Sequence, residues 1–199
     1  MMKIIFFILV TLSLLSSNET FEEIKDAYFK SYHYEHIGKY AEAIKTLAPL
    51  TKKYPKGYTL NLRLAWLFYL KKHYSTATAY YQKASLLKTQ AFEPKLGLIR
   101  INLATCSFEK AQNIATEILK VDYYNYYANL YMAKSLIAQK KYKIANSIIT
   151  KMLIIYPTDI LFLEQLFLSY QATNDIHAHD VYQSILILDP NNVLVGNTL

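Results

Sequence analysis

The chain has 199 residues, of which 53% are hydrophobic and 19% charged, with only four Gly and five Pro. This composition supplies enough apolar material for one helical core and argues against an intrinsically disordered chain. The formal charge of +7 comes mainly from lysines spread along the chain, which argues against the basic blocks of a nucleic-acid-binding tail.

Residues 1–17 have the pattern of a secretory signal peptide. Lys3 is followed by the apolar run 4–15 and then by Ser16 and Ser17. The run is well short of the roughly 20 apolar residues that a membrane-spanning helix needs. We therefore expect cleavage after residue 17 and a periplasmic or secreted protein with no stable transmembrane span. Retention as an anchor is the alternative, because Leu15 stands where a small side chain is preferred.

A repeat of 34 residues organises the rest of the chain. Four aromatic residues recur at this spacing, and each is followed three residues later by an alanine: Tyr40 and Ala43, Tyr74 and Ala77, Phe108 and Ala111, Tyr142 and Ala145. Pro55 and Pro157 are three such periods apart. Ala178 and Pro190 arrive one residue early, so the last repeat is one residue short. A fixed period of this length indicates an array of helical hairpins.

From residue 24 to residue 192 the chain resembles the tetratricopeptide repeat (TPR) family. The residues that match the family's consensus classes in the second repeat are Leu64, Ala65, Phe68, Tyr74, Ala77, Tyr81 and Ala84, and in the fourth Met132, Ala133, Leu136, Tyr142, Ala145, Ile149, Met152 and Pro157. The resemblance implies an all-α fold, a right-handed α-solenoid of about five stacked helix-turn-helix hairpins. The single solenoid domain covers residues 18–192, with repeats near 24–57, 58–91, 92–125, 126–159 and 160–192.

The predicted helices come in pairs, over residues 21–36 and 40–53, 57–71 and 74–88, 91–104 and 108–121, 125–139 and 142–155, and 158–172 and 176–188. Small residues such as Ala65 and Ala77 let two antiparallel helices approach, while large neighbours such as Phe68 fill the space around them. Each hairpin buries only part of its apolar surface, so neighbouring hairpins must stack.

Two positions suggest weaker packing. Ile99 stands where the family has a small residue, which predicts looser helix contacts in the third repeat. The tail of residues 193–199 is too short for a full capping helix, which predicts partial exposure of Val181, Ile185 and Leu188. An exposed apolar end predicts self-association, contact with a partner, or a continuation of the chain.

The resemblance implies that the first helix of each pair lines a concave surface. Read with the helical period, this surface collects aromatic and basic side chains. The partner-binding candidates are Tyr28, Tyr32, Arg63, Trp66, Tyr69, Arg100, Tyr131 and Lys134, with Glu35, Tyr127, Glu164 and Gln165 on the same face. Aromatic rings offer large apolar faces, and Arg and Lys donate to carboxylates, so the groove suits an extended peptide or a glycan strand. Packing between helices is the other role for many of the 19 tyrosines.

The sequence contains no recognisable catalytic motif or metal-binding cluster. His33 and His36 share one helix without a clear third ligand, and His177 and His179 fall at a turn. Cys106 lies at a predicted turn with no base nearby, and no phosphate-binding or nucleophile motif occurs. We therefore expect a protein that is not an enzyme and that has no cofactor, metal or nucleic-acid partner.

These features favour a non-catalytic protein–protein interaction scaffold in the cell envelope that binds an extended partner segment in its concave groove. The alternative is a glycan-contacting accessory TPR protein of polysaccharide export or synthesis, because exported TPR segments also resemble the periplasmic part of such exporters. Glycan-array binding that depends on Trp66 favours the alternative, whereas crosslinking to one protein partner favours the scaffold. The repeat does not identify the partner, because one fold serves many partners.

Overall fold

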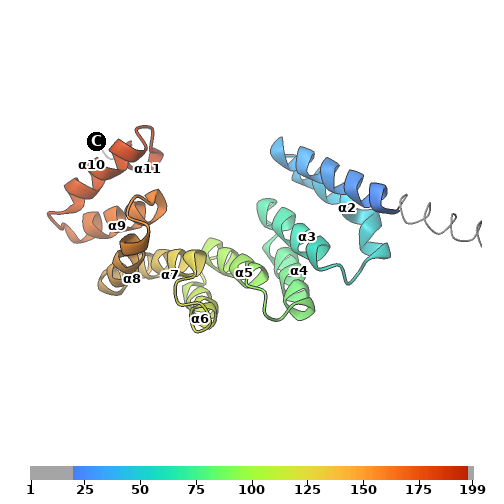
Figure 1. Ribbon diagram of the computed structural model, residues 1–199, viewed down its shortest axis with the longest axis horizontal. Coiled ribbons are helices and arrows are strands. Elements are labelled where there is room, and N and C mark those ends of the chain that lie inside the picture. Colours follow the sequence, from blue (N-terminus) through green and yellow to red (C-terminus); the bar gives the residue numbers. More distant parts are fainter. Residues whose placement is uncertain (1–19, 197–199) are drawn as a thin grey trace, which may run out of the picture. The chain divides into compact units, whose positions relative to one another are not determined.

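The computed structural model describes residues 20–196, with side chains up to residue 194, and within this range it contains helices and turns but no strand. The described part of the chain is therefore all-α, as expected (Figure 1). The segment predicted as a signal peptide lies outside the described residues. Between residues 20 and 196, no helix is long and apolar enough to cross a membrane.

The chain divides into two compact units, and the boundary follows Gln90. In the N-terminal unit, a helix over residues 20–36 precedes α2 (Tyr40–Lys53), α3 (Tyr58–Leu70) and α4 (Tyr74–Leu87). The C-terminal unit contains α5 (Glu93–Ala104), α6 (Phe108–Leu119), α7 (Tyr126–Ala138), α8 (Tyr142–Ile155), α9 (Ile160–Thr173), α10 (Ala178–Leu188) and α11 (Val193–Gly196). The ten predicted helices match the observed ones to within about two residues at each end.

Each hairpin is held together by small residues at its centre. The alanines that define the repeat, Ala43, Ala77, Ala111 and Ala145, are all at most 1% exposed. The first helices have their own buried series at the 34-residue spacing, made of Ser31, Ala65, Ile99, Ala133 and Phe167. Within the C-terminal unit, α7 contacts both α5 and α9, so the first helices of successive hairpins pack side by side.

Ile99 corrects one expectation. Its side chain is fully buried and belongs to one core cluster with Ala111, Ala115 and Ile118 of α6. The prediction of looser contacts in the third repeat is therefore wrong. A larger side chain fits at this position because the residues of α6 in the same cluster include two alanines.

The turn inside each hairpin contains one residue with a left-handed backbone. These residues are Gly38, Lys72, Cys106, Lys140 and Asn174, with φ between 53° and 72°, and they recur every 34 residues. The N–H of the next residue donates back five positions, as from His73 to the carbonyl of Phe68 at 2.9 Å, which closes the preceding helix. Cys106 therefore occupies a turn position, as the sequence predicted.

Two of the turns between hairpins are held by an asparagine side chain, which belongs to the first turn of α3 in one case and of α7 in the other. The Nδ2 of Asn61 donates to the carbonyls of Gly57 (2.7 Å) and Pro55 (3.2 Å). Two repeats later, Asn129 Nδ2 donates to the carbonyls of Asn125 (2.9 Å) and Tyr123 (3.1 Å). Tyr123 stands two periods after Pro55, and it can take the place of that proline because the hydrogen bond uses the main-chain carbonyl and not the side chain.

The C-terminal end differs from the expectation. Val181 and Ile185 are buried, at 9% and 0% exposed, whereas Leu188 is 43% exposed as predicted. The prediction is wrong for the first two residues because the tail turns back as α11, and its Leu194 packs against the same core. Self-association through this end stays a prediction.

The side chain of Asn192 anchors this turn. Its Nδ2 donates to Glu164 Oε1 at 2.8 Å and to Asp189 Oδ2 at 3.1 Å, and its Oδ1 accepts from the N–H of Leu194 at 3.1 Å. Glu164, placed on the concave face by sequence reasoning, is therefore part of the C-terminal closure.

Candidate partner-binding site

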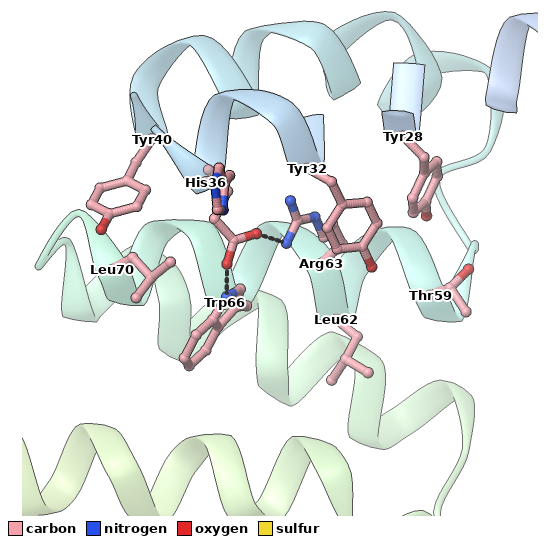
Figure 2. Close-up of a pocket in the computed structure, with 10 residues that line it drawn as sticks. Tyr28, Tyr32, His36, Tyr40, Thr59, Leu62, Arg63, Trp66 and Leu70 are labelled. Atoms are coloured by element: carbon pink, nitrogen blue, oxygen red, sulfur yellow. Dashed lines mark hydrogen bonds and ion pairs between the residues drawn. The ribbon is translucent and has the colours of Figure 1, made fainter. Parts of the chain in front are cut away.

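A cavity of about 950 Å³ lies between the helix over residues 20–36 and α3, within the N-terminal unit (Figure 2). It is lined by Tyr28, Tyr32, Glu35 and His36 of the first helix, Tyr40 of α2, and Thr59, Leu62, Arg63, Trp66 and Leu70 of α3. On both helices the lining positions follow the offsets of about 3, 4, 7, 8 and 11 residues that place side chains on one face of a helix. Four of the predicted binding residues, Tyr28, Tyr32, Arg63 and Trp66, meet here.

The carboxylate of Glu35 is the centre of the polar contacts in this cavity. It forms a close ion pair with Nη1 of Arg63, and its other oxygen accepts from Trp66 Nε1 at 2.6 Å (Figure 2). Arg63 Nη2 donates to the hydroxyl of Ser31 at 3.2 Å. The guanidinium carbon also lies 3.8 Å from the centroid of the Tyr32 ring, a cation–π contact.

These contacts hold Arg63 in place and neutralise it. Its side chain is only 6% exposed, and that of Glu35 is 22% exposed. The sequence suggested that Arg63 donates to a partner's carboxylate, but the structure supplies that carboxylate from within the chain. The pair joins two first helices and also orients the indole of Trp66 toward the cavity.

Two tyrosines complete the surroundings of Trp66 and Arg63. Tyr69 stacks on the Trp66 ring, with centroids 5.5 Å apart and planes at 25°, but it does not line the cavity. Tyr28 lines the opposite end, where burial raises the pKa of its hydroxyl above the usual value of 10.0, partly offset by a hydrogen bond with Thr59. Tyr28 is therefore neutral at physiological pH and can both donate and accept.

The other three candidates, Arg100, Tyr131 and Lys134, belong to the C-terminal unit. Arg100 Nε donates to the hydroxyl of Tyr131 at 2.8 Å. Tyr131 also stacks on Tyr127, with centroids 5.9 Å apart and planes at 27°, and Tyr127 is 48% exposed. Lys134 is half-buried on α7. The eight candidates therefore form two sets, one in each unit.

Sequence reasoning missed the role of Glu35. It placed Glu35 and Arg63 on the same concave face but did not join them. The available signal was the pairing of opposite charges on equivalent faces of adjacent first helices, together with a tryptophan one helical turn from the arginine. Gln165, assigned to the same face, is 5% exposed and belongs to the interior.

The histidines and the cysteine do not gather around a metal in the described part of the chain. Between residues 20 and 196, no group of three or more His, Cys, Asp or Glu side chains is placed to hold a metal ion. Cys106 is exposed. The ring of His177 lies 2.8 Å from the carboxylate of Asp175, on the surface of the turn before α10.

Comparison with solved structures identifies the fold. MamA from Desulfovibrio magneticus (residue 41 to the end) has a TM-score of 0.71 at 12% identity over 86% of this chain and 97% of its own. A tetratricopeptide repeat protein from Parabacteroides merdae has a TM-score of 0.72 at 16% identity over 87% and 70%. YrrB, described as a TPR protein with an unusual peptide-binding site, has a TM-score of 0.64 at 11% identity over 91% and 96%.

At these identities the similarity shows the fold alone. No protein-family model and no curated protein sequence matches the chain. The chain therefore has the architecture of the tetratricopeptide repeat proteins, an all-α solenoid, and the predicted fold class is confirmed.

Proposed function

We propose that this chain is a non-catalytic interaction scaffold of the cell envelope, and that its N-terminal unit binds an extended segment of a protein partner. The observation that carries the proposal is the cavity between residues 20–36 and α3, where Trp66 is held by Glu35 and bordered by tyrosines. Tryptophan, tyrosine and arginine are the residues that most often dominate the binding energy of protein interfaces.

The cavity has the size and chemistry of a binding site. Its volume of about 950 Å³ lies near the upper end of the range for ligand pockets, which is roughly 300–1,000 Å³. Arg63 is already paired with Glu35 and Ser31 through its two terminal nitrogens, so a partner's apolar side chain can enter without removing the counter-charge of Arg63. Tyr32 is 57% exposed and offers part of its ring for contact. YrrB, which shares the fold, is described as binding a peptide.

Site-directed photocrosslinking tests this function. A photoreactive amino acid in place of Tyr32 is expected to crosslink one protein from an envelope extract. The same amino acid in place of Ile144, which is equally exposed at 57% but lies on a second helix, is the matched control. Loss of the Tyr32 crosslink in the Trp66→Ala variant ties the contact to the cavity. Identical products from both positions would contradict a site in this cavity.

The envelope location rests on Lys3 and the apolar run that follows it. Cell fractionation with N-terminal sequencing of the mature chain checks it, and the expected new N-terminus is Asn18. A chain that starts at Met1 and stays with the soluble cytoplasmic proteins would contradict export.

The stacked rings of Tyr127 and Tyr131 favour the glycan alternative as a second candidate, because an exposed aromatic face can stack on a sugar ring. Under this alternative the C-terminal unit makes the contact. The structure moves the test of this alternative from Trp66 to Tyr127, because Glu35 holds the indole of Trp66 in the N-terminal cavity whereas Tyr127 is 48% exposed. Glycan-array binding lost in Tyr127→Ala but retained in Trp66→Ala would favour the glycan alternative over the protein scaffold.

A further inference from the structure

The N-terminal unit carries the whole net charge of the protein. Residues 20–90 contain twelve Lys and Arg against five Asp and Glu, whereas residues 91–199 contain nine of each. Four of the five acidic residues, namely Glu22, Glu23, Asp26 and Glu35, are already in ion pairs within the unit. The remaining lysines give the unit a strongly positive field, which attracts acidic partners.

Part of this charge lies next to the Trp66 cavity. A second cavity of about 610 Å³ is lined by Tyr34, Gly38, Lys39, Tyr40, Ala41, Glu42 and Lys71. The two cavities share Tyr40, and Lys71 follows Leu70 of the first cavity directly in the chain. The two cavities therefore meet at Tyr40, and the second forms an edge with two exposed lysines, where Glu42 is the acidic lining residue.

The centre of the Trp66 cavity, in contrast, favours an uncharged group. Glu35 neutralises Arg63 there, so a carboxylate from a partner would meet Glu35 as a like charge. An ammonium group would have to compete with Arg63 for the same carboxylate. An uncharged side chain avoids both conflicts and gains the apolar faces of Trp66 and Tyr32.

We infer that the occupant of this site is an acidic peptide segment with one large uncharged side chain, aromatic or aliphatic, which enters the Trp66 cavity. The Asp and Glu residues next to it contact Lys39 and Lys71 at the adjoining edge. This inference rests on the proposed function and adds the chemistry of the partner to it.

Selection from a displayed library of random dodecapeptides on the full chain tests the inference, with the Trp66→Ala variant as counter-selection. We expect Trp66-dependent peptides that contain Phe, Tyr, Trp, Leu or Ile next to several Asp or Glu residues. Trp66-dependent peptides that are basic or neutral would overturn the inference and leave the proposed function standing. Enrichment that does not depend on Trp66 would overturn both.

A defined peptide gives the quantitative test. Its probe is a synthetic dodecapeptide with one Phe among Asp and Gly residues, titrated while the fluorescence of Trp66, the single tryptophan of the chain, is recorded. Replacing Phe by Ala is expected to weaken binding about tenfold or more, as for an interface anchor. An equal affinity for the Ala peptide would contradict entry of the side chain into the cavity.

Charge reversal distinguishes a direct contact of the peptide with the lysine edge from attraction by the net positive charge of the protein. Lys39→Glu with Lys71→Glu changes two exposed residues and is expected to weaken binding of the Phe peptide about tenfold at low salt, with less effect at high salt. Lys110→Glu with Lys143→Glu makes the same charge change on exposed residues of the C-terminal unit and is the control. Equal weakening by both pairs would overturn the assignment of the edge.

The Glu35→Gln variant tests whether the ion pair between Glu35 and Arg63 excludes a partner's carboxylate from the cavity. The amide oxygen can still accept from Trp66, but Arg63 keeps its charge without a counter-ion. We expect this variant to bind the peptide with Asp in place of Phe about tenfold more tightly than the unaltered protein does. No gain, with circular dichroism showing an intact fold, would contradict the role given to the ion pair.

Discussion

The two units share one hairpin plan but use their first helices differently. In the N-terminal unit, the helix over residues 20–36 and α3 are joined by a part-buried ion pair beside a cavity, and the unit carries a charge of +7. In the C-terminal unit, Arg100 bonds to a tyrosine hydroxyl, and the formal charge is zero. An arginine and a tyrosine ring occur in both units, but in the N-terminal unit the arginine is paired with a carboxylate, whereas in the C-terminal unit it forms a part-buried hydrogen bond with the tyrosine itself.

This difference shows that the residues that form the hairpin and the side chains on the exposed face of the first helices can vary independently. The residues that set the hairpin recur in both units, namely the central alanine, the left-handed turn residue and, in one hairpin of each, the asparagine of the first turn. They are buried or confined to turns, so the side chains on the open face of the first helices can vary without disturbing them. Binding chemistry can therefore be concentrated in one unit while the fold continues through both.

The largest expected effect tests whether the two units unfold separately. Phe162 is completely buried in the C-terminal unit, and Phe162→Ala is expected to lower its stability by about 4 kcal/mol. Because Trp66 reports only on the N-terminal unit, its fluorescence midpoint in urea should move less than the circular dichroism midpoint. Leu64→Ala, in the N-terminal unit, should reverse this order. Equal shifts of both probes in both variants would show one cooperative transition.

The second effect concerns the ion pair that distinguishes the N-terminal unit. Glu35→Ala leaves the guanidinium of Arg63 buried without a counter-charge and is expected to lower stability by about 3 kcal/mol. Arg100→Ala, which removes a hydrogen bond to Tyr131, should lower it by about 1 kcal/mol. Urea denaturation measures both.

A double variant is the control for Glu35→Ala. Adding Arg63→Met removes the unpaired charge and should restore about half of the lost stability or more, since an apolar side chain can replace a buried charge. A double variant no more stable than the single one would mean that the loss comes from packing and not from charge.

The third comparison uses the asparagine that both units share. Asn129→Ala is expected to lower stability by about 2 kcal/mol and Asn61→Ala by about 1 kcal/mol. Both variants lose two hydrogen bonds to carbonyls, but Asn129 Oδ1 also accepts from Lys151 Nζ at 2.6 Å. Desolvation by burial lowers the pKa of Lys151, so its ammonium group is sensitive to the loss of an acceptor. Equal losses would show that the contact with Lys151 adds nothing.

The smallest effects come from the left-handed turn residues. Gly38→Ala is expected to lower stability by about 1 kcal/mol, because an added Cβ meets no atom within 4 Å and only the backbone conformation is strained. Lys140→Gly should raise stability by about 0.5 kcal/mol at the equivalent turn of the C-terminal unit, where φ is 60°. Thermal unfolding measures both, and opposite signs would show that the left-handed backbone is not the source of strain at these turns.

Much of the fold was predictable because it repeats. An aromatic residue followed three positions later by an alanine, as in Tyr40 and Ala43, recurs every 34 residues. This pattern predicted paired helices, and their predicted ends agree with the structure. The series of left-handed residues was equally regular but passed unnoticed, because Gly38, Lys72 and Cys106 share no side-chain chemistry. Only their backbone conformation is common, and residue type reports that weakly outside glycine and asparagine.

The site was predictable only in part. Tyr28, Tyr32, Arg63 and Trp66 were assigned to one face and do line one cavity, because the helical period determines which side chains share a face. The partners of those side chains were not predictable, and neither was the return of α11 onto the C-terminal core. Both depend on contacts between residues far apart in the chain.

The amino-acid sequence alone determined the all-α class, the hairpin period and the face on which the binding candidates lie, because these follow from local spacing along a helix. Only the tertiary structure showed that Glu35 forms an ion pair with Arg63 and that Asn192 holds the C-terminal turn through a hydrogen bond to Glu164. It also showed the cavity beside Trp66. A hydrogen bond requires its donor and acceptor within about 3 Å and in line. Helical spacing specifies which faces meet, whereas the angle and distance between packed helices specify which atoms do.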